Sequence, residues 1–110
     1  MEVSFESSKL ERICEDEKRM VRRFGARQAK RLMLRLDDLL SADTLEDLRD
    51  NPGRYHELTS NWTGHLSVDL VHPYRLIFRP TADPPRTGTG GELVWSEVTA
   101  VTVVAIEDTH

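Results

Sequence analysis

Histidine, arginine and aspartate residues stand where they could support acid–base chemistry on a phosphodiester. His56 follows a Pro-Gly turn, His110 stands two residues after Asp108, and Arg75 and Arg79 share one face of a predicted strand. Cleavage of RNA through its own 2′-hydroxyl needs a base, an acid and a cation that stabilises the extra negative charge on phosphorus. Two histidines and an arginine suffice for these roles, and Asp108 could orient His110.

Other kinds of catalytic site find little support in the sequence. None of the four histidines has the helical spacing of a zinc-binding pair, and one cysteine is too few for a structural zinc site. No Gly-rich phosphate loop and no G-x-S-x-G motif is present. Paired acids at Asp37 and Asp38, or at residues 15–17, could hold magnesium, but such groups on helices are usually solvated. We therefore expect no metal and no cofactor, although each histidine by itself could equally be an ordinary strand or surface residue.

The composition is that of a folded protein. With 110 residues, 38% of them apolar and 31% charged, the chain is expected to form one domain over residues 1–110. No apolar run approaches the roughly 20 residues of a membrane span, and Glu2 and Glu6 occupy the place of a secretory signal's basic segment, so we expect a cytoplasmic protein with no membrane partner. Cys14 lies among apolar positions of a predicted helix, which favours a core thiol over a catalytic one.

Charge is distributed unevenly along the chain. The formal net charge is −4, yet eight basic residues and no acidic residue lie between Lys18 and Arg35. A polyanion responds to the local field and not to the total charge. Arg27, Lys30 and Arg31 are therefore candidate contacts to RNA phosphates, and the same run is compatible with the solvated face of a helical hairpin.

Two helices are predicted in the first half of the chain. Ser8 and Glu11 form the pattern of a capping box, and the apolar positions from Leu10 to Phe24 follow a helical stripe that ends at Gly25. The second helix should turn one apolar stripe to the core and keep its basic side chains outside. The stripe comprises Ala29, Leu32, Met33, Leu36, Leu39 and Leu40, and the basic residues are Arg27, Lys30, Arg31 and Arg35.

Strands are predicted mainly in the second half, where the hydrophobic period changes to two. The strand-like segments are residues 2–5, 54–58, 65–70, 74–79 and 98–106. Because the connections at 59–64 and 71–73 have hairpin lengths, at least three strands should be antiparallel neighbours. The Pro- and Gly-rich residues 81–92 predict a loop. The fold class expected is α+β, with helices first and an antiparallel sheet after.

Several segments taken together resemble the HigB branch of the RelE/ParE toxin superfamily, the small toxins of bacterial toxin-antitoxin pairs. They are residues 48–58 (LRDNPGRYHEL), 66–68 (LSV), 74–78 (YRLIF), 95–98 (WSEV) and 106–110 (IEDTH). The resemblance spans most of the chain and implies a RelE-like fold, a helical hairpin packed on an antiparallel sheet. It also implies a metal-independent endoribonuclease that cuts messenger RNA on the ribosome, with His56, Asp108 and His110 as catalytic residues and Arg75 as a phosphate ligand.

The chain departs from the family pattern at Thr109, where the family has a tyrosine. A tyrosine ring can stack on a base and its phenol can carry a proton, whereas threonine supplies only a small hydroxyl. Tyr55, Trp62 or Tyr74 could supply a stacking ring instead. Each of these aromatic residues could equally serve as core or cross-strand packing.

The partners implied by the resemblance are a cognate antitoxin protein, messenger RNA on the ribosome, and operator DNA only through the antitoxin. Two alternatives stay open at this point. One is a non-catalytic toxin of the ParE type that inhibits DNA gyrase and lacks the histidine set. The other is an inactive antitoxin-binding relative, for which Thr109 is the motivating residue.

Overall fold

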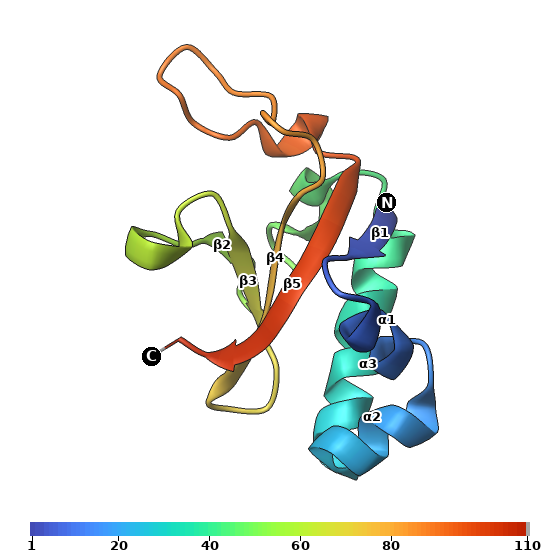
Figure 1. Ribbon diagram of the computed structural model, residues 1–110. Helices are drawn as coiled ribbons and strands as arrows, with labels where there is room; N and C mark the ends of the chain where they lie inside the picture. Colours follow the sequence, from blue (N-terminus) through green and yellow to red (C-terminus); the bar gives the residue numbers. More distant parts are fainter. Residues whose placement is uncertain (110) are drawn as a thin grey trace.

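The five strands form one mixed sheet in the computed structural model, which describes residues 1–109. The strands are β1 (Glu2–Phe5), β2 (His56–Glu57), β3 (Leu66–Asp69), β4 (Tyr74–Pro80) and β5 (Ala100–Asp108), and their order across the sheet is β1-β5-β4-β3-β2. All neighbours are antiparallel except β1 and β5, which are parallel. Figure 1 shows the helices on one side of the sheet, while the segment between β4 and the last 3-10 turn extends from one end. The predicted α+β class is confirmed, with a parallel edge pair added to the expected antiparallel sheet.

The helical half contains α1 (Ser8–Cys14), α2 (Glu17–Phe24) and α3 (Ala26–Ser41). The first predicted helix is divided in two because the Asp16 carboxylate accepts the N–H groups of Lys18 and Arg19 and so begins a new helix. The predicted cap at Ser8 is one residue late, since the Ser7 hydroxyl accepts the Leu10 N–H at 3.1 Å. The break at Gly25 is confirmed: this residue has φ +85° and joins α2 to α3.

The core lies between α3 and the helix-facing side of the sheet. On α3 the buried apolar residues include Ala29, Leu32, Leu36 and Leu39, which confirms most of the predicted stripe, whereas Leu40 is 56% exposed. The sheet contributes alternate positions, as expected for a strand with one face on a core. These positions are Leu66, Val68, Leu76, Phe78, Val101 and Val103.

Arg35 corrects the sequence-based prediction that all four basic residues of this helix remain outside the core. Its side chain is buried, with the residue only 4% exposed. Its Nε donates to the Asp69 carbonyl oxygen at 2.9 Å and its Nη1 to the Pro52 carbonyl oxygen at 3.2 Å. A guanidinium can be buried at such a site because hydrogen bonds to backbone carbonyls replace part of its hydration. Arg35 thus joins α3 to the turn before β2 and to the end of β3.

Gly53 occupies a position where both backbone conformation and space favour glycine. Its φ is +104°, and a Cβ added there would lie 2.7 Å from Val68 Cγ2 and 2.8 Å from Arg35 Cζ. We expect Gly53→Ala to lower the free energy of unfolding by about 1–3 kcal/mol, through left-handed strain and displacement of Arg35. Urea unfolding would measure this loss, with Gly64→Ala as control: Gly64 also has positive φ (+88°) but open space around its Cβ position. If both variants lost the same free energy of unfolding, contact of the added Cβ with Arg35 and Val68 would contribute nothing to the loss at Gly53.

Candidate active site

The face of the sheet away from the helices carries the candidate catalytic side chains. His56 on β2 is paired with Ser67 on β3, which is paired with Ile77 on β4. Two residues further along, Asp69 on β3 is paired with Arg75 on β4. Because side chains alternate across a strand, these residues point away from the face where Leu66 and Val68 pack on the helices.

The Asp69 carboxylate holds two arginines beside each other. Its Oδ2 is 2.8 Å from Nε of Arg54, and its Oδ1 is 3.3 Å from Nε of Arg75. The Arg54 side chain is 70% exposed and that of Arg75 only 13%, so one cation reaches into solvent and the other lies at the sheet surface. Two guanidinium groups around one carboxylate leave a local excess of positive charge, which suits a phosphate.

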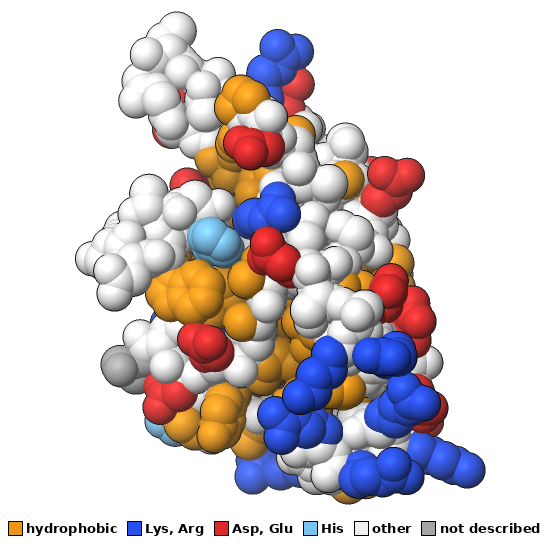
Figure 2. All heavy atoms as spheres, in the orientation of Figure 1, with side chains coloured by type: hydrophobic (Ala, Val, Ile, Leu, Met, Phe, Trp, Pro, Cys, Tyr) orange, Lys and Arg blue, Asp and Glu red, His pale blue; other side chains and the backbone are white. Residues whose placement is uncertain are grey.

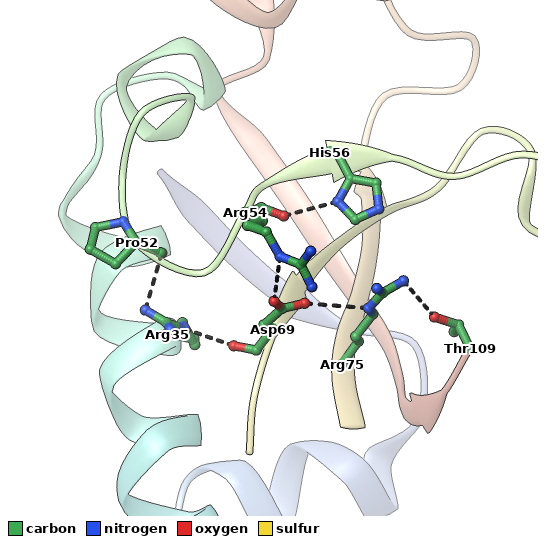
Figure 3. A network of polar contacts seen from close by, with 7 residues as sticks. All are labelled: Arg35, Pro52, Arg54, His56, Asp69, Arg75 and Thr109. Atoms are coloured by element: carbon green, nitrogen blue, oxygen red, sulfur yellow. Dashed lines mark hydrogen bonds and ion pairs between the residues drawn. The ribbon is translucent and has the colours of Figure 1, made fainter. Parts of the chain in front are cut away.

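His56 is oriented by the backbone of the same turn. Its Nδ1 lies 2.9 Å from the Arg54 carbonyl oxygen. A carbonyl oxygen can only accept, so Nδ1 carries the hydrogen and, in the neutral ring, Nε2 presents a lone pair as a proton acceptor. In Figure 3 the His56 ring and the Arg54 and Arg75 guanidinium groups reach toward the same space beside Asp69. β2 and β4 are separated by one strand, so His56 and Arg75 lie about 10 Å apart across the sheet, a span that a phosphodiester and its sugar can bridge.

The backbone at Arg54 is held in an unusual conformation. Arg54 has φ +57°, directly after Gly53 with φ +104°. A non-glycine residue in this region is strained and persists only where neighbouring contacts hold it. Here the contacts are the Asp69 carboxylate on the Arg54 side chain and the His56 ring on its carbonyl oxygen. The turn therefore aims the Arg54 guanidinium and the His56 ring at the same face.

The end of β5 brings two further residues to this region. Thr109 Oγ1 accepts a hydrogen bond from Nη1 of Arg75 at 3.0 Å. Asp108 and Thr109 line a pocket together with Arg75. The strand register pairs Asp108 with Tyr74 and places Glu107 directly opposite Arg75, so Asp108 lines the same pocket as Arg75 without occupying the strand position that faces it. His110 lies outside the described residues.

Arg79 is placed apart from this cluster. It is four residues further along β4, or about 13 Å from Arg75. Its Nη2 is 3.9 Å from Oε1 of Glu6, and its Nη1 donates to the Pro80 carbonyl oxygen at 3.2 Å. Arg79 therefore belongs to the opposite end of the sheet, although it projects from the same face as Arg75.

The basic residues of α3 lie beside the end of the sheet that carries Asp69 and Arg75. Gln28 exchanges two hydrogen bonds with the Val71 backbone, and Arg35 binds the Asp69 carbonyl, so the helix face between them meets this segment. Arg31 lies on that face between Gln28 and Arg35 and is half-buried. Arg27 and Lys30 are exposed, and Figure 2 shows Lys and Arg side chains gathered over α2 and the start of α3.

The thiol of Cys14 does not form part of a reactive site. The residue is buried, which confirms the core-thiol interpretation, and burial together with the charge of Glu15 raises the thiol pKa to about 11. Within residues 1–109 there is no group of three or more His, Cys, Asp or Glu side chains placed to hold a metal ion. In the same range, no helix has the length and apolar character needed to span a membrane.

Sequence reasoning missed Arg54, Asp69 and Arg35 as members of this site. Arg54 lies within the segment quoted for the family resemblance, next to the Pro-Gly turn, but nothing local distinguishes it from a solvated strand residue. Asp69 interrupts the apolar run of β3 just before Leu70 and Val71, which is a weak signal of a partnered acid. The burial of Arg35 has no local signal, because its acceptors lie 17 and 34 residues away.

Comparisons with known proteins agree with this architecture. The family model described as the RelE-like toxin of type II toxin-antitoxin system HigB matches residues 3–83, well over half of the chain. The YoeB-YefM complex from Staphylococcus aureus is similar in fold: the match covers 100% of this chain and 98% of that chain, with a TM-score of 0.57 and 13% sequence identity. No curated protein matches the sequence. The chain belongs to the HigB-like family of RelE-like toxins of type II toxin-antitoxin systems.

Proposed function

We propose that this toxin is a metal-independent endoribonuclease that cleaves messenger RNA on the ribosome. The observation that carries the proposal is the arrangement of Arg54 and Arg75 around the Asp69 carboxylate, with the His56 ring held by the Arg54 carbonyl oxygen, on the face of the sheet away from the helices. They supply a proton acceptor and two cations, which are two of the three kinds of group that cleavage through the 2′-hydroxyl requires; the third is an acid for the leaving oxygen. Membership of the toxin family is consistent with this activity.

In the proposed reaction, Nε2 of His56 removes the proton of a 2′-hydroxyl as O2′ attacks the adjacent phosphorus. Arg54 and Arg75 stabilise the additional negative charge on the phosphoryl oxygens. The bond from phosphorus to O5′ breaks, and we assign protonation of that oxygen to His110, with Asp108 as its orienting carboxylate. The products are a 2′,3′-cyclic phosphate and a free 5′-hydroxyl, and no redox or metal step is needed.

The proposed partners are ribosomal RNA, messenger RNA and an antitoxin protein. Arg27, Lys30 and Arg31 would contact phosphates of ribosomal RNA, giving binding that weakens with salt. Arg54 and Arg75 would bind the phosphate at the cleavage site, because Arg79 lies at the other end of β4. We further propose a cognate antitoxin protein as the inhibitor, with operator DNA bound only through that antitoxin.

The proposal is tested by mapping RNA 5′-ends shortly after the chain is expressed without an antitoxin. The control is a His56→Ala/His110→Ala variant at a matched protein level. New 5′-hydroxyl ends in phase with codons, absent in the variant, are the expected result. Growth arrest without new ends would contradict the proposal and favour a toxin that acts by binding, such as one that inhibits gyrase. Unimpaired growth would favour an inactive relative.

A further inference from the structure

A pocket of about 410 Å³ adjoins the candidate active site and shares Arg75 and Asp108 with it, while its other wall has no role in the reaction described above. One wall is the segment between β2 and β3, formed by Leu58, Thr59, Ser60, Asn61 and Trp62. The other wall is formed by Arg75, Asp108 and Thr109. The volume falls in the range of small-molecule sites, roughly 300–1,000 Å³.

The wall formed by residues 58–62 is a fixed structure. The backbone N–H of Trp62 donates to the Thr59 carbonyl oxygen at 3.1 Å, and the Thr63 hydroxyl donates to the Ser60 carbonyl oxygen at 2.8 Å. His65 donates its N–H to the Trp62 carbonyl oxygen at 3.0 Å, which closes the turn onto β3. Ser60 has φ +56°, a strained value that these bonds maintain. A preorganised wall loses little entropy when a ligand binds.

The chemistry of the pocket suits a nucleobase joined to a phosphate. Trp62 offers a half-buried indole, and the His65 ring packs against it in a T-shaped arrangement at 5.3 Å. Every nucleobase has a π-face that can stack on such a ring, and one stacking contact contributes about 1–3 kcal/mol. The Arg75 guanidinium at the opposite wall provides the cation that a neighbouring phosphate needs.

The other large aromatic residues are placed where they cannot serve this pocket. Tyr55 is 5% exposed, packs edge to face on Phe78, and burial raises the pKa of its phenol. Tyr74 is exposed but lines a separate pocket beside α2. Trp95 is 4% exposed beneath the Arg49 guanidinium, 4.0 Å from the ring centroid. Trp62 is the member of this group that shares a pocket with Arg75 and Thr109.

We infer that this pocket is a nucleobase subsite for single-stranded RNA, with Trp62 as the stacking platform and Arg75 as the phosphate anchor at its rim. The inference rests on the proposed function, because it places one base of the cleaved strand next to the reacting phosphate. Thr109 contributes no ring to this pocket, so the stacking ring comes from the β2–β3 segment, where Trp62 lines the opposite wall.

The test uses 2′-O-methyl trinucleotides, which lack the attacking hydroxyl and so bind without being cleaved. NMR follows binding in the millimolar range through the indole N–H resonances of the two tryptophans. The resonance that disappears in Trp62→Phe is that of Trp62. We expect the Trp62 resonance to shift and that of Trp95, which is 4% exposed and whose indole N–H donates to the Glu57 carboxylate at 3.1 Å, to remain unchanged. Trp62→Ala should weaken binding about 5- to 100-fold, and Trp62→Phe, which keeps a ring, much less.

A matched control is Tyr74→Val, which removes an exposed aromatic ring at the other pocket and keeps a residue favoured in strands. Its affinity for the trinucleotides should equal that of the wild type. An unmoved Trp62 resonance, or equal affinities of Trp62→Ala and wild type, would overturn the inference.

The same assay separates this inference from the cleavage proposal. Trinucleotide binding that depends on Trp62 in a protein that generates no new RNA ends would keep the subsite and reject the nuclease. Cleavage that needs His56 but is unaffected by Trp62→Ala, in rate and in base preference, would keep the nuclease and reject the subsite.

Discussion

Replacing His56 by alanine is expected to lower the rate of RNA cleavage by about 10²–10⁴-fold, the usual contribution of a positioned general base. The physical reason is the geometry of the ring, whose Nδ1 is held by the Arg54 carbonyl oxygen so that Nε2 is the proton acceptor. Because the base acts in the transition state, the loss should appear in kcat and leave KM nearly unchanged.

The measurement is single-turnover cleavage of a defined messenger RNA on purified ribosomes, with wild type and variant compared at saturating toxin. His72→Ala is the control: this histidine is exposed in the turn between β3 and β4 and belongs to neither wall of the site. A His56→Ala variant that retains more than about a third of the wild-type rate would exclude His56 as the base.

Replacing Arg35 by leucine is expected to lower the free energy of unfolding by about 2–5 kcal/mol. The variant leaves the partly buried carbonyl oxygens of Asp69 and Pro52 without the guanidinium that now donates to them. Each unsatisfied buried acceptor costs about 1–3 kcal/mol. This loss is a large share of the roughly 5–15 kcal/mol that stabilises a typical domain, so the leucine variant could unfold. Arg35→Lys is the milder variant, because lysine keeps a hydrogen-bond donor but lacks the planar guanidinium that binds two acceptors at once.

Urea unfolding followed by tryptophan fluorescence measures this effect, with Arg27→Gln as the matched control on an exposed position of the same helix. We expect the control to change stability by no more than about 0.5 kcal/mol. A loss below about 1 kcal/mol for Arg35→Leu would mean that water satisfies the two carbonyls and that Arg35 does not stabilise the turn before His56.

Local pattern accounts for most of the elements. The bounds predicted for β1, residues 2–5, agree with the structure, and the period of two in residues 65–70 places Leu66 and Val68 on the helix-facing side of β3. The stripe of α3 was likewise predicted from spacing alone. Periodicity and caps depend on residues a few positions apart, so the sequence carries them directly.

The candidate site was predicted only in part. His56 and Arg75 were identified by residue type and by the family resemblance, and both lie on the face of the sheet away from the helices. The family match ends at residue 83, so the assignment of Asp108 and Thr109 to the same region depends on the pairing of β5 with β4. The positioning residue Asp69 and the second cation, Arg54, emerge only when β2, β3 and β4 are placed side by side.

The α+β class, most of the helices and strands, and the family of this toxin follow from local patterns and motifs in the sequence. The parallel pairing of β1 with β5, almost a whole chain length away, and the burial of Arg35 against two backbone carbonyls arise only in the folded chain. The fold also decides that Trp62, and neither Tyr55 nor Tyr74, faces the same pocket as Arg75. The physical reason is the same in each case: these contacts join residues distant in the chain, and their free energy depends on burial and on partners that no local pattern specifies.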